Sequence, residues 1–154
     1  MKHHCLFVIL LTVVLMASCN GRVVYDKYDH TPIAGWEKND TLLFDVNTVK
    51  ESGVYSGRLG LRINSAFPFT SLVMIVRRTI IPRNIVIADT VNCKLMDENN
   101  GRPKGQGVGY YQYEFPLKDI LLEQGDSMHI VIRHNMRREI LPGISDVGIE
   151  IKKK

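Results

Sequence analysis

The chain contains little cysteine: Cys5, Cys19 and Cys93 are the three copies in 154 residues. Small secreted domains without a sizeable core are usually stapled by several disulfides. Here Cys5 falls in a segment that we expect to be removed, and Cys19 is expected to carry lipid, so Cys93 is left alone and an intramolecular disulfide is excluded. Cys93 alternates with polar neighbours, which predicts a small buried core residue rather than a reactive thiol.

A hydrophobic run long enough to span a membrane is also lacking. The apolar stretch Leu6–Leu15 has ten residues, whereas a spanning helix needs about 20. Lys2 precedes this stretch, and Ala17, Ser18 and Cys19 follow it, which is typical of an export signal. Small residues directly before a cysteine match the lipobox of bacterial lipoproteins. We therefore predict cleavage after residue 18 and diacylglycerol on Cys19, in preference to an ordinary signal with a chance cysteine.

The chain has no strong excess of one charge. It carries 20 basic and 16 acidic residues, a net charge of +4 that falls to +3 when Lys2 is removed. This balance is far from that of a nucleic-acid-binding surface. The basic pairs, such as Arg77-Arg78 and Arg137-Arg138, are expected on solvated faces and loop ends. Lys152–Lys154 is expected to be a solvated end, with weak attraction to anionic lipid as the alternative.

Motifs for catalysis and metal binding are absent. A nucleophile elbow needs glycine where Val147 stands, and the glycines of 101–109 lack the Gly-Lys-Ser/Thr of a phosphate-binding loop. We expect those glycines in a flexible hairpin connection, where they supply positive φ. His129 and His134 are five apart and so face opposite sides of a strand. The sequence predicts no enzyme, no cofactor, no metal site and no small-molecule substrate.

Period-two alternation dominates the rest of the chain and predicts half-buried strands. Two more continuously apolar runs, Ser71–Thr79 and Asn84–Leu95, are expected to be central strands. Leu117–Glu123 is expected to form one or two helical turns. The alternating sets are Leu42, Phe44 and Val46; Leu59, Leu61 and Ile63; Tyr111, Tyr113 and Phe115; Met128, Ile130 and Ile132; and Val147, Ile149 and Ile151.

This pattern predicts an all-β fold, an antiparallel two-sheet β-sandwich of Ig-like or jelly-roll-like type. Residues 1–18 are expected to be the signal peptide. Residues 19–35 are expected to be the lipidated cysteine and a polar tether. The sandwich domain is expected to span 36–154.

Several segments resemble the gliding motility lipoprotein GldH family. They are Val24–Tyr28 followed by Gly35-Trp36, the segment Phe67–Leu72, the block from Asp89 to Gly109, and the closing run Leu141–Ile151 with its Gly-Ile-x-Asp-Val-Gly signature. The resemblance covers nearly the whole mature chain. It implies a lipid-anchored, non-enzymatic assembly or scaffold component of gliding that is linked to the type IX secretion apparatus. Its implied partners are the membrane and other lipoproteins or proteins of that machinery.

Two further hypotheses concern ligands and location. A carbohydrate-binding β-sandwich lipoprotein is the alternative function, because aromatic side chains can stack on sugars. Asn20 and the lack of an acidic cluster after Cys19 favour the outer membrane, facing the periplasm.

The candidate interaction residues are Trp36, Phe67, Phe69, Gly107, Gly109 and Asp146. The Asp-Ser/Thr-aliphatic motif makes Thr41, Thr90 and Ser127 candidate O-glycosylation sites.

Overall fold

The computed structural model describes residues 22–154, so the predicted signal peptide and Cys19 lie outside the described residues. The strands are β1 (Val23–His30), β2 (Trp36–Glu37), β3 (Leu42–Val46), β4 (Gly53–Asn64), β5 (Ser71–Ile81), β6 (Ile85–Lys94), β7 (Tyr110–Leu122), β8 (Ser127–His134), β9 (Ile140–Leu141) and β10 (Ile144–Lys153). No stretch of residues 22–154 forms a helix with the length and apolarity needed to cross a bilayer.

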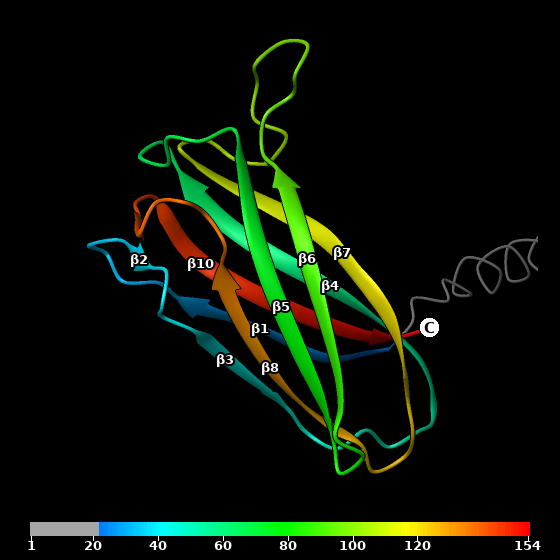
Figure 1. Ribbon diagram of the computed structural model, residues 1–154. Coiled ribbons are helices and arrows are strands. Elements are labelled where there is room, and N and C mark those ends of the chain that lie inside the picture. The colour runs from blue at the N-terminus through cyan, green and yellow to red at the C-terminus, as the bar shows by residue number, and fades with distance from the viewer. Residues whose placement is uncertain (1–21) are drawn as a thin grey trace, which may run out of the picture.

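The strands form two antiparallel four-stranded sheets that face each other (Figure 1). Sheet 1 has the order β1-β10-β4-β7 and sheet 2 has the order β3-β8-β5-β6, while β2 and β9 pair separately. The chain passes from one sheet to the other at β3–β4, β4–β5, β6–β7 and β7–β8, and also between β1 and β3 by way of β2 and between β8 and β10 by way of β9. The expected two-sheet β-sandwich is therefore confirmed.

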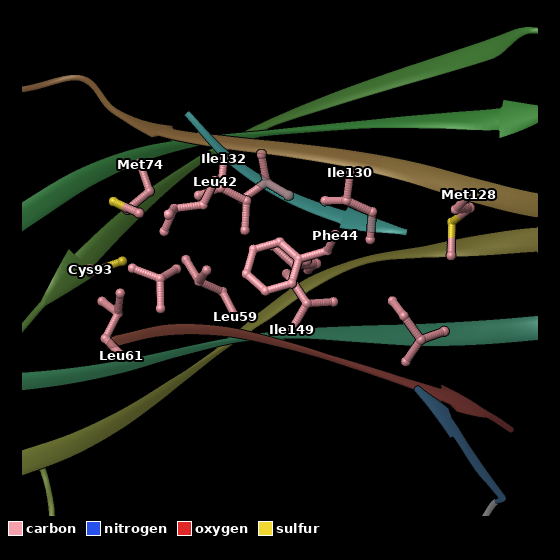
Figure 2. Close-up of a cluster of buried hydrophobic side chains, with 14 of the residues drawn as sticks. Leu42, Phe44, Leu59, Leu61, Met74, Cys93, Met128, Ile130, Ile132 and Ile149 are labelled. Atoms are coloured by element: carbon pink, nitrogen blue, oxygen red, sulfur yellow. The ribbon is translucent and has the colours of Figure 1, made fainter. Parts of the chain in front are cut away.

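The core lies between the two sheets and is made by the predicted alternating positions. Phe44 of β3 and Ile130 of β8 meet Leu59 of β4 and Ile149 of β10 across the interior (Figure 2). All four side chains are buried. Burying one such side chain contributes about 1.5–3 kcal/mol relative to exposure, so these positions account for much of the folding free energy. Cys93 is also buried in this core, as predicted.

The tether expected over residues 19–35 is corrected by the structure. Val23–His30 is β1, an edge strand of sheet 1 that pairs with β10 from Val23↔Lys152 to His30↔Asp146. The alternation of β1 is faint because the strand is exposed along most of its length and its register shifts between Val23 and Tyr25. The folded domain therefore starts at about residue 22 and not at Trp36.

The helical turns expected at Leu117–Glu123 are wrong, because this segment belongs to β7. Leu117 and Ile120 are both buried although they are three residues apart, a spacing typical of a helix. The spacing comes from a bulge: Ile120 pairs with Tyr55 and Leu117 with Gly57, so β7 has one residue more than β4 at this point. An extra residue restarts the alternation of a strand without ending it.

Two expectations for the segment 84–109 are also corrected. β5 is central as expected, but β6 lies at the edge of sheet 2. The glycine-containing segment after β6 does not close a hairpin, because β6 pairs with β5 and β7 pairs with β4. It is a crossover between the two sheets. Apolar content alone did not distinguish an edge strand that is covered on its inner face from a central one.

Candidate functional site

One end of the sandwich gathers most of the long connections. We call it the distal end, since it is the end opposite Arg22, and it comprises the connections 31–35, 65–70, 95–109 and 135–143. The segment 95–109 projects from it beyond the tip of β6 (Figure 1). The distal end and the adjoining outer face of sheet 1 bring together segments that are far apart in the sequence.

Tyr28 lies flat on the outer face of sheet 1, above two glycines of neighbouring strands. A Cβ atom at Gly60 would lie 2.2 Å from the Tyr28 hydroxyl oxygen, and one at Gly148 would lie 2.7 Å from its ring. Arg62 stacks over the ring with its guanidinium carbon 4.4 Å from the centroid, a favourable cation–π arrangement. Burial raises the pKa of the Tyr28 hydroxyl, and the charge of Arg62 opposes that rise. The glycines therefore make room for the ring.

Asp146 anchors the end of β1 to the start of β10. Its Oδ1 lies 2.5 Å from Nδ1 of the exposed His30, and its Oδ2 accepts a 2.8 Å hydrogen bond from the Ser145 hydroxyl. The carboxylate is buried. Thr31, the next residue after His30, donates from its backbone N–H to the carbonyl of Ser145 at 3.1 Å. These contacts fix the point where the connection 31–35 leaves sheet 1.

Gly143 allows the connection before β10 to pack against the connection before β5. Its φ is +81°, and a Cβ there would lie 2.3 Å from the backbone nitrogen of Phe67. The carbonyl of Gly143 accepts a 2.8 Å hydrogen bond from the N–H of Asn64. Phe67 and Phe69 form an edge-to-face pair with centroids 5.5 Å apart. Only glycine combines this backbone conformation with so close an approach.

The side chain of Trp36 is buried within the distal end. Its indole N–H donates to the carbonyl of Asp40 at 3.1 Å, and its ring meets the His134 ring edge-to-face at 5.4 Å. Both side chains are fully buried. Burial lowers the pKa of His134 below its ordinary value, because the charged imidazolium loses its hydration. Trp36 therefore holds the connections in place and has no exposed surface of its own.

The crossover 95–109 is folded back on itself by two isolated bridges, Met96↔Pro103 and Gln106↔Gln112. Gly107 has φ +134° and approaches the backbone of Tyr110, where a Cβ would lie 2.0 Å from the carbonyl oxygen. Gly109 has φ +77° with open space around it. The expected positive φ is thus confirmed for Gly101, Gly107 and Gly109 but not for Gly105, and the segment is a crossover.

Two grooves flank Lys94 at the base of this crossover. One has a volume of about 570 Å³ and lies along β7, where Tyr113 and Phe115 are lined up with Gln112 and Glu114. The Tyr113 and Phe115 rings are stacked with centroids 6.4 Å apart. The other has a volume of about 400 Å³ and is lined by residues 70–71, 92, 94, 96–98 and 101. Within residues 22–154, no group of three or more histidine, cysteine or acidic residues could hold a metal ion.

Apolar side chains project into solvent from the same end. Ile33 is fully exposed in the turn before β2, and Ile140 of the partner strand β9 is 45% exposed. Val108, on the crossover, and Tyr110, the first residue of β7, are 97% and 60% exposed. Apolar side chains grouped at one end of a domain are typical of surfaces that bind other proteins. The distal end can thus offer contacts to another protein.

A family profile described as GldH lipoprotein matches residues 23–151, which is nearly all of the described chain. The chain belongs to the GldH lipoprotein family. The gliding motility lipoprotein GldH homolog of Christiangramia forsetii is 26% identical over 156 residues, covering 96% of this chain and 94% of that protein. The gliding motility lipoprotein GldH of Flavobacterium johnsoniae is 26% identical over 162 residues, with 96% and 95% covered.

Solved structures with a similar arrangement of strands include parts of carbohydrate-active proteins. A GH115 4-O-methyl-alpha-glucuronidase, BtGH115A, has a TM-score of 0.47 at 16% identity and covers 89% of this chain and 18% of the enzyme. The carbohydrate-binding module CBM6cm-2 of Cellvibrio mixtus lichenase 5A, in complex with cellotriose, has a TM-score of 0.40 at 14% identity, covering 86% and 90%.

The residues of the GldH family motifs form the contacts described above. Tyr28 of the N-terminal block covers Gly148 of the closing signature, Asp146 contacts His30, and Gly143 packs against Phe67. Three blocks that are separate in sequence thus become one structure. Two of the candidate interaction residues, Trp36 and Asp146, are buried. A partner at these points would therefore contact the exposed residues that Trp36 and Asp146 hold in place.

Two candidate glycosylation residues, Thr90 of β6 and Ser127 of β8, lie on sheet 2, and Thr41 directly precedes β3. Thr41 and Thr90 are exposed and Ser127 is half-buried. Their preceding aspartates serve other contacts: Asp89 binds Arg78 inside the sandwich, and Asp126 binds Arg83. The burial of Arg78 corrects the expectation that the basic pairs are all solvated, because Arg78 is 0% exposed.

The exposed residues Ile33, Val108 and Ile140 were missed by the sequence reasoning. A signal existed for Ile33, which is an aliphatic residue inside the turn-forming run Thr31–Gly35 and has no alternating neighbours. Such a residue has no core face to occupy. Ile140 gave no comparable signal, because its exposure depends on the two-residue pairing of β9 with β2.

Proposed function

We propose that this protein is a non-enzymatic assembly or scaffold component of the gliding and type IX secretion machinery, and that it engages other proteins of that machinery through its distal end. The observation that carries the proposal is the family match over residues 23–151. The exposed apolar side chains of the distal end support its role as the contact surface.

The protein is anchored through Cys19 in this proposal. The thiol forms a thioether with diacylglycerol, and residues 1–18 are removed so that the modified Cys19 becomes the amino terminus. Lipidated proteins with one such anchor can present a folded domain to partners without crossing the bilayer. Asn20 and the lack of an acidic cluster after Cys19 support the outer membrane, with the domain in the periplasm.

Deletion of the gene in its own host tests this function. We expect the deletion strain to lose type IX secretion, and gliding where the host glides, and a copy of the wild-type gene to restore them. A Cys19→Ala variant should appear in the soluble fraction and fail to restore secretion. Wild-type secretion in the deletion strain would remove the proposed role. A Cys19→Ala variant that stays in the membrane would remove the anchor.

A carbohydrate-binding function is the second candidate, and one observation favours it. The groove of about 570 Å³ along β7 combines the stacked rings of Tyr113 and Phe115 with polar side chains such as Gln112. Apolar rings bordered by a few polar groups are typical of sugar sites. Calorimetry of the mature protein against a glycan panel tests it, with Phe115→Ala as the variant that should abolish binding. A panel without any binder would exclude this candidate.

O-glycosylation of Thr41, Thr90 or Ser127 is proposed as a modification of the native protein. The support is the motif at each position and the exposure of Thr41 and Thr90. The intact mass of protein purified from its own cells is the test. Hexose increments that disappear in a Thr41→Ala, Thr90→Ala variant are expected, whereas a mass that contains lipid alone would contradict the modification.

A further inference from the structure

The distance between the predicted anchor and the first strand is very short. Cys19 precedes Arg22 by three residues, and β1 begins at Val23. Three extended residues reach at most about 10 Å. The sandwich itself is much longer, because the 12 residues of β4 span about 40 Å at the usual rise of a strand. A protein anchored at Cys19 therefore keeps the end of the sandwich that holds Arg22 close to the headgroups.

This proximal end carries a concentration of basic residues. Arg22 begins the described chain, and Lys152, Lys153 and Lys154 end it beside the start of β1, with Val23 paired to Lys152 and the N–H of Lys153 donating to the carbonyl of Arg22. The loop before β4 adds Lys50. Four acidic residues lie at this end: Glu51 contacts Arg22 at 3.5 Å and also binds Lys153, Asp119 binds Lys154, and Glu123 and Asp126 both bind Arg83 of the turn between β5 and β6. Basic residues remain in excess.

The proximal end also exposes aliphatic side chains. Val23 and Val24 are exposed on β1, while Val54 and Leu121 form an exposed cross-strand pair between β4 and β7. Leu121 is 63% exposed. Aliphatic and basic side chains on one surface are the combination that binds a membrane interface, since the former enter the headgroup layer and the latter attract anionic lipid.

A groove opens at this same end. It has a volume of about 340 Å³, and its walls include Val24, Val49 and Tyr55. Three basic residues, Arg22, Lys50 and Lys153, and one acidic residue, Glu51, line it as well. The apolar part suits the glycerol and the upper acyl carbons of a lipid, and the cationic side chains suit its phosphate. The groove lies beside the residue that leads directly to Cys19.

We propose that the proximal end docks on the bilayer that holds the anchor, with the headgroup of an anionic phospholipid in the groove beside Arg22 and Lys50. This docking rests on the proposed anchor at Cys19. It fixes the orientation of the domain: the strands rise from the membrane and the distal end faces away from it, about 40 Å above the headgroups. The apolar residues Ile33 and Val108 are then held out toward protein partners.

The test uses the full mature lipoprotein, purified with its lipid and placed in phosphatidylethanolamine vesicles that contain or lack phosphatidylglycerol. A fluorophore is attached at a proximal position outside the groove, Gln124→Cys, or at a distal one, Asn99→Cys, both of which are exposed. Cys93 does not compete for the label, because burial raises the pKa of its thiol to about 12. The readout is quenching by lipids that carry a quencher on the headgroup.

We expect the proximal label to be quenched more strongly than the distal one, and more strongly again when phosphatidylglycerol is present. The double variant Lys50→Gln, Lys152→Gln should lose the additional quenching, since each charge near an anionic surface changes the docking equilibrium about fivefold. Neither lysine forms an ion pair within residues 22–154, so folding is not at risk. The matched control Arg137→Gln, Arg138→Gln removes two charges from the distal end and should behave as the wild type.

Equal quenching of the two labels in protein that floats with the vesicles would overturn the docking and leave the anchor intact. The same holds if the proximal variant and the distal control give the same quenching. Protein that carries no acyl mass and does not float with vesicles would overturn the anchor of the proposed function and, with it, the docking.

Discussion

The guanidinium of Arg78 and the carboxylate of Asp89 form an ion pair inside the sandwich, between Nη2 and Oδ2. Arg78 is 0% exposed and Asp89 is 6% exposed. The Nη1 of Arg78 also donates to the carbonyl of Lys118 at 2.9 Å, on the bulged stretch of β7. Because Arg78 lies on β5, it joins β5 to β6 of sheet 2 through Asp89 and to the edge strand β7 of sheet 1 through the carbonyl of Lys118.

Removal of either partner of this pair should be strongly destabilising. We expect Asp89→Ala to lower the free energy of unfolding by about 3–5 kcal/mol, because a buried guanidinium is left without its counter-charge. Urea unfolding followed by circular dichroism measures the effect. The double variant Arg78→Met, Asp89→Leu should be closer to the wild type than either single variant. A single variant with unchanged stability would show that the pair is solvated in solution.

The packing of Tyr28 on its two glycines predicts a coupling between strands. Gly148→Ala places a methyl group 2.7 Å from the Tyr28 ring, and we expect a loss of about 1–3 kcal/mol from this overpacking. In a Tyr28→Ser background the same Gly148→Ala change should cost little, because the ring has gone. The double-mutant cycle measures this difference. Equal costs in both backgrounds would mean that the ring does not lie on the glycine.

The burial of His134 predicts a loss of stability in acid. Its pKa in the folded protein is lowered from 6.5 by burial, so the unfolded chain takes up a proton at a higher pH than the folded chain. The contribution is therefore fully present above pH 6.5 and is lost as the pH falls through the folded pKa. Urea unfolding at several pH values should show this slope in the wild type. His134→Phe should have a shallower slope, and an unchanged slope would assign the effect to other groups.

The buried thiol of Cys93 should resist alkylation in the native protein. Burial raises its pKa to about 12, so almost no thiolate is present at neutral or mildly alkaline pH. We expect iodoacetamide to label the protein in urea but not in its absence, as measured by intact mass. Labelling of the folded protein at the rate of a free thiol would contradict the packing of Cys93 in the core.

The exposed apolar residues of the distal end should affect function without affecting folding. We expect Ile33→Asp and Val108→Asp to keep stability within about 0.5 kcal/mol of the wild type, since exposed substitutions rarely cost more. In the complementation test both should restore secretion poorly. Leu43→Asp is the matched control, because Leu43 is exposed on the outer face of sheet 2 and not at the distal end. Full complementation by both distal variants would place the contact elsewhere.

The candidate site could be predicted from the sequence only in part. The family motifs were visible as separate blocks, and the structure joins them because Gly148 admits the ring of Tyr28 and Gly143 admits the backbone of Phe67. Which residues reach solvent could not be read in the same way. Trp36 was expected at an interaction surface and is buried, while Ile33 was overlooked and is fully exposed. The exposure of a side chain to solvent depends on which other segments of the chain pack against it.

The sequence alone determined the all-β class, most of the strands and the burial of Cys93. Apolar residues that alternate with polar ones are buried together only when they form the inner face of a sheet. Only the tertiary structure decided that Val23–His30 is a strand and no tether, since an edge strand that is exposed along most of its length leaves little alternation. It also decided that β7 continues through Leu117–Leu122, where a bulge imitates helical spacing. The burial of Arg78 was likewise decided by its partner Asp89, because a charge can be buried only where the fold supplies its counter-charge.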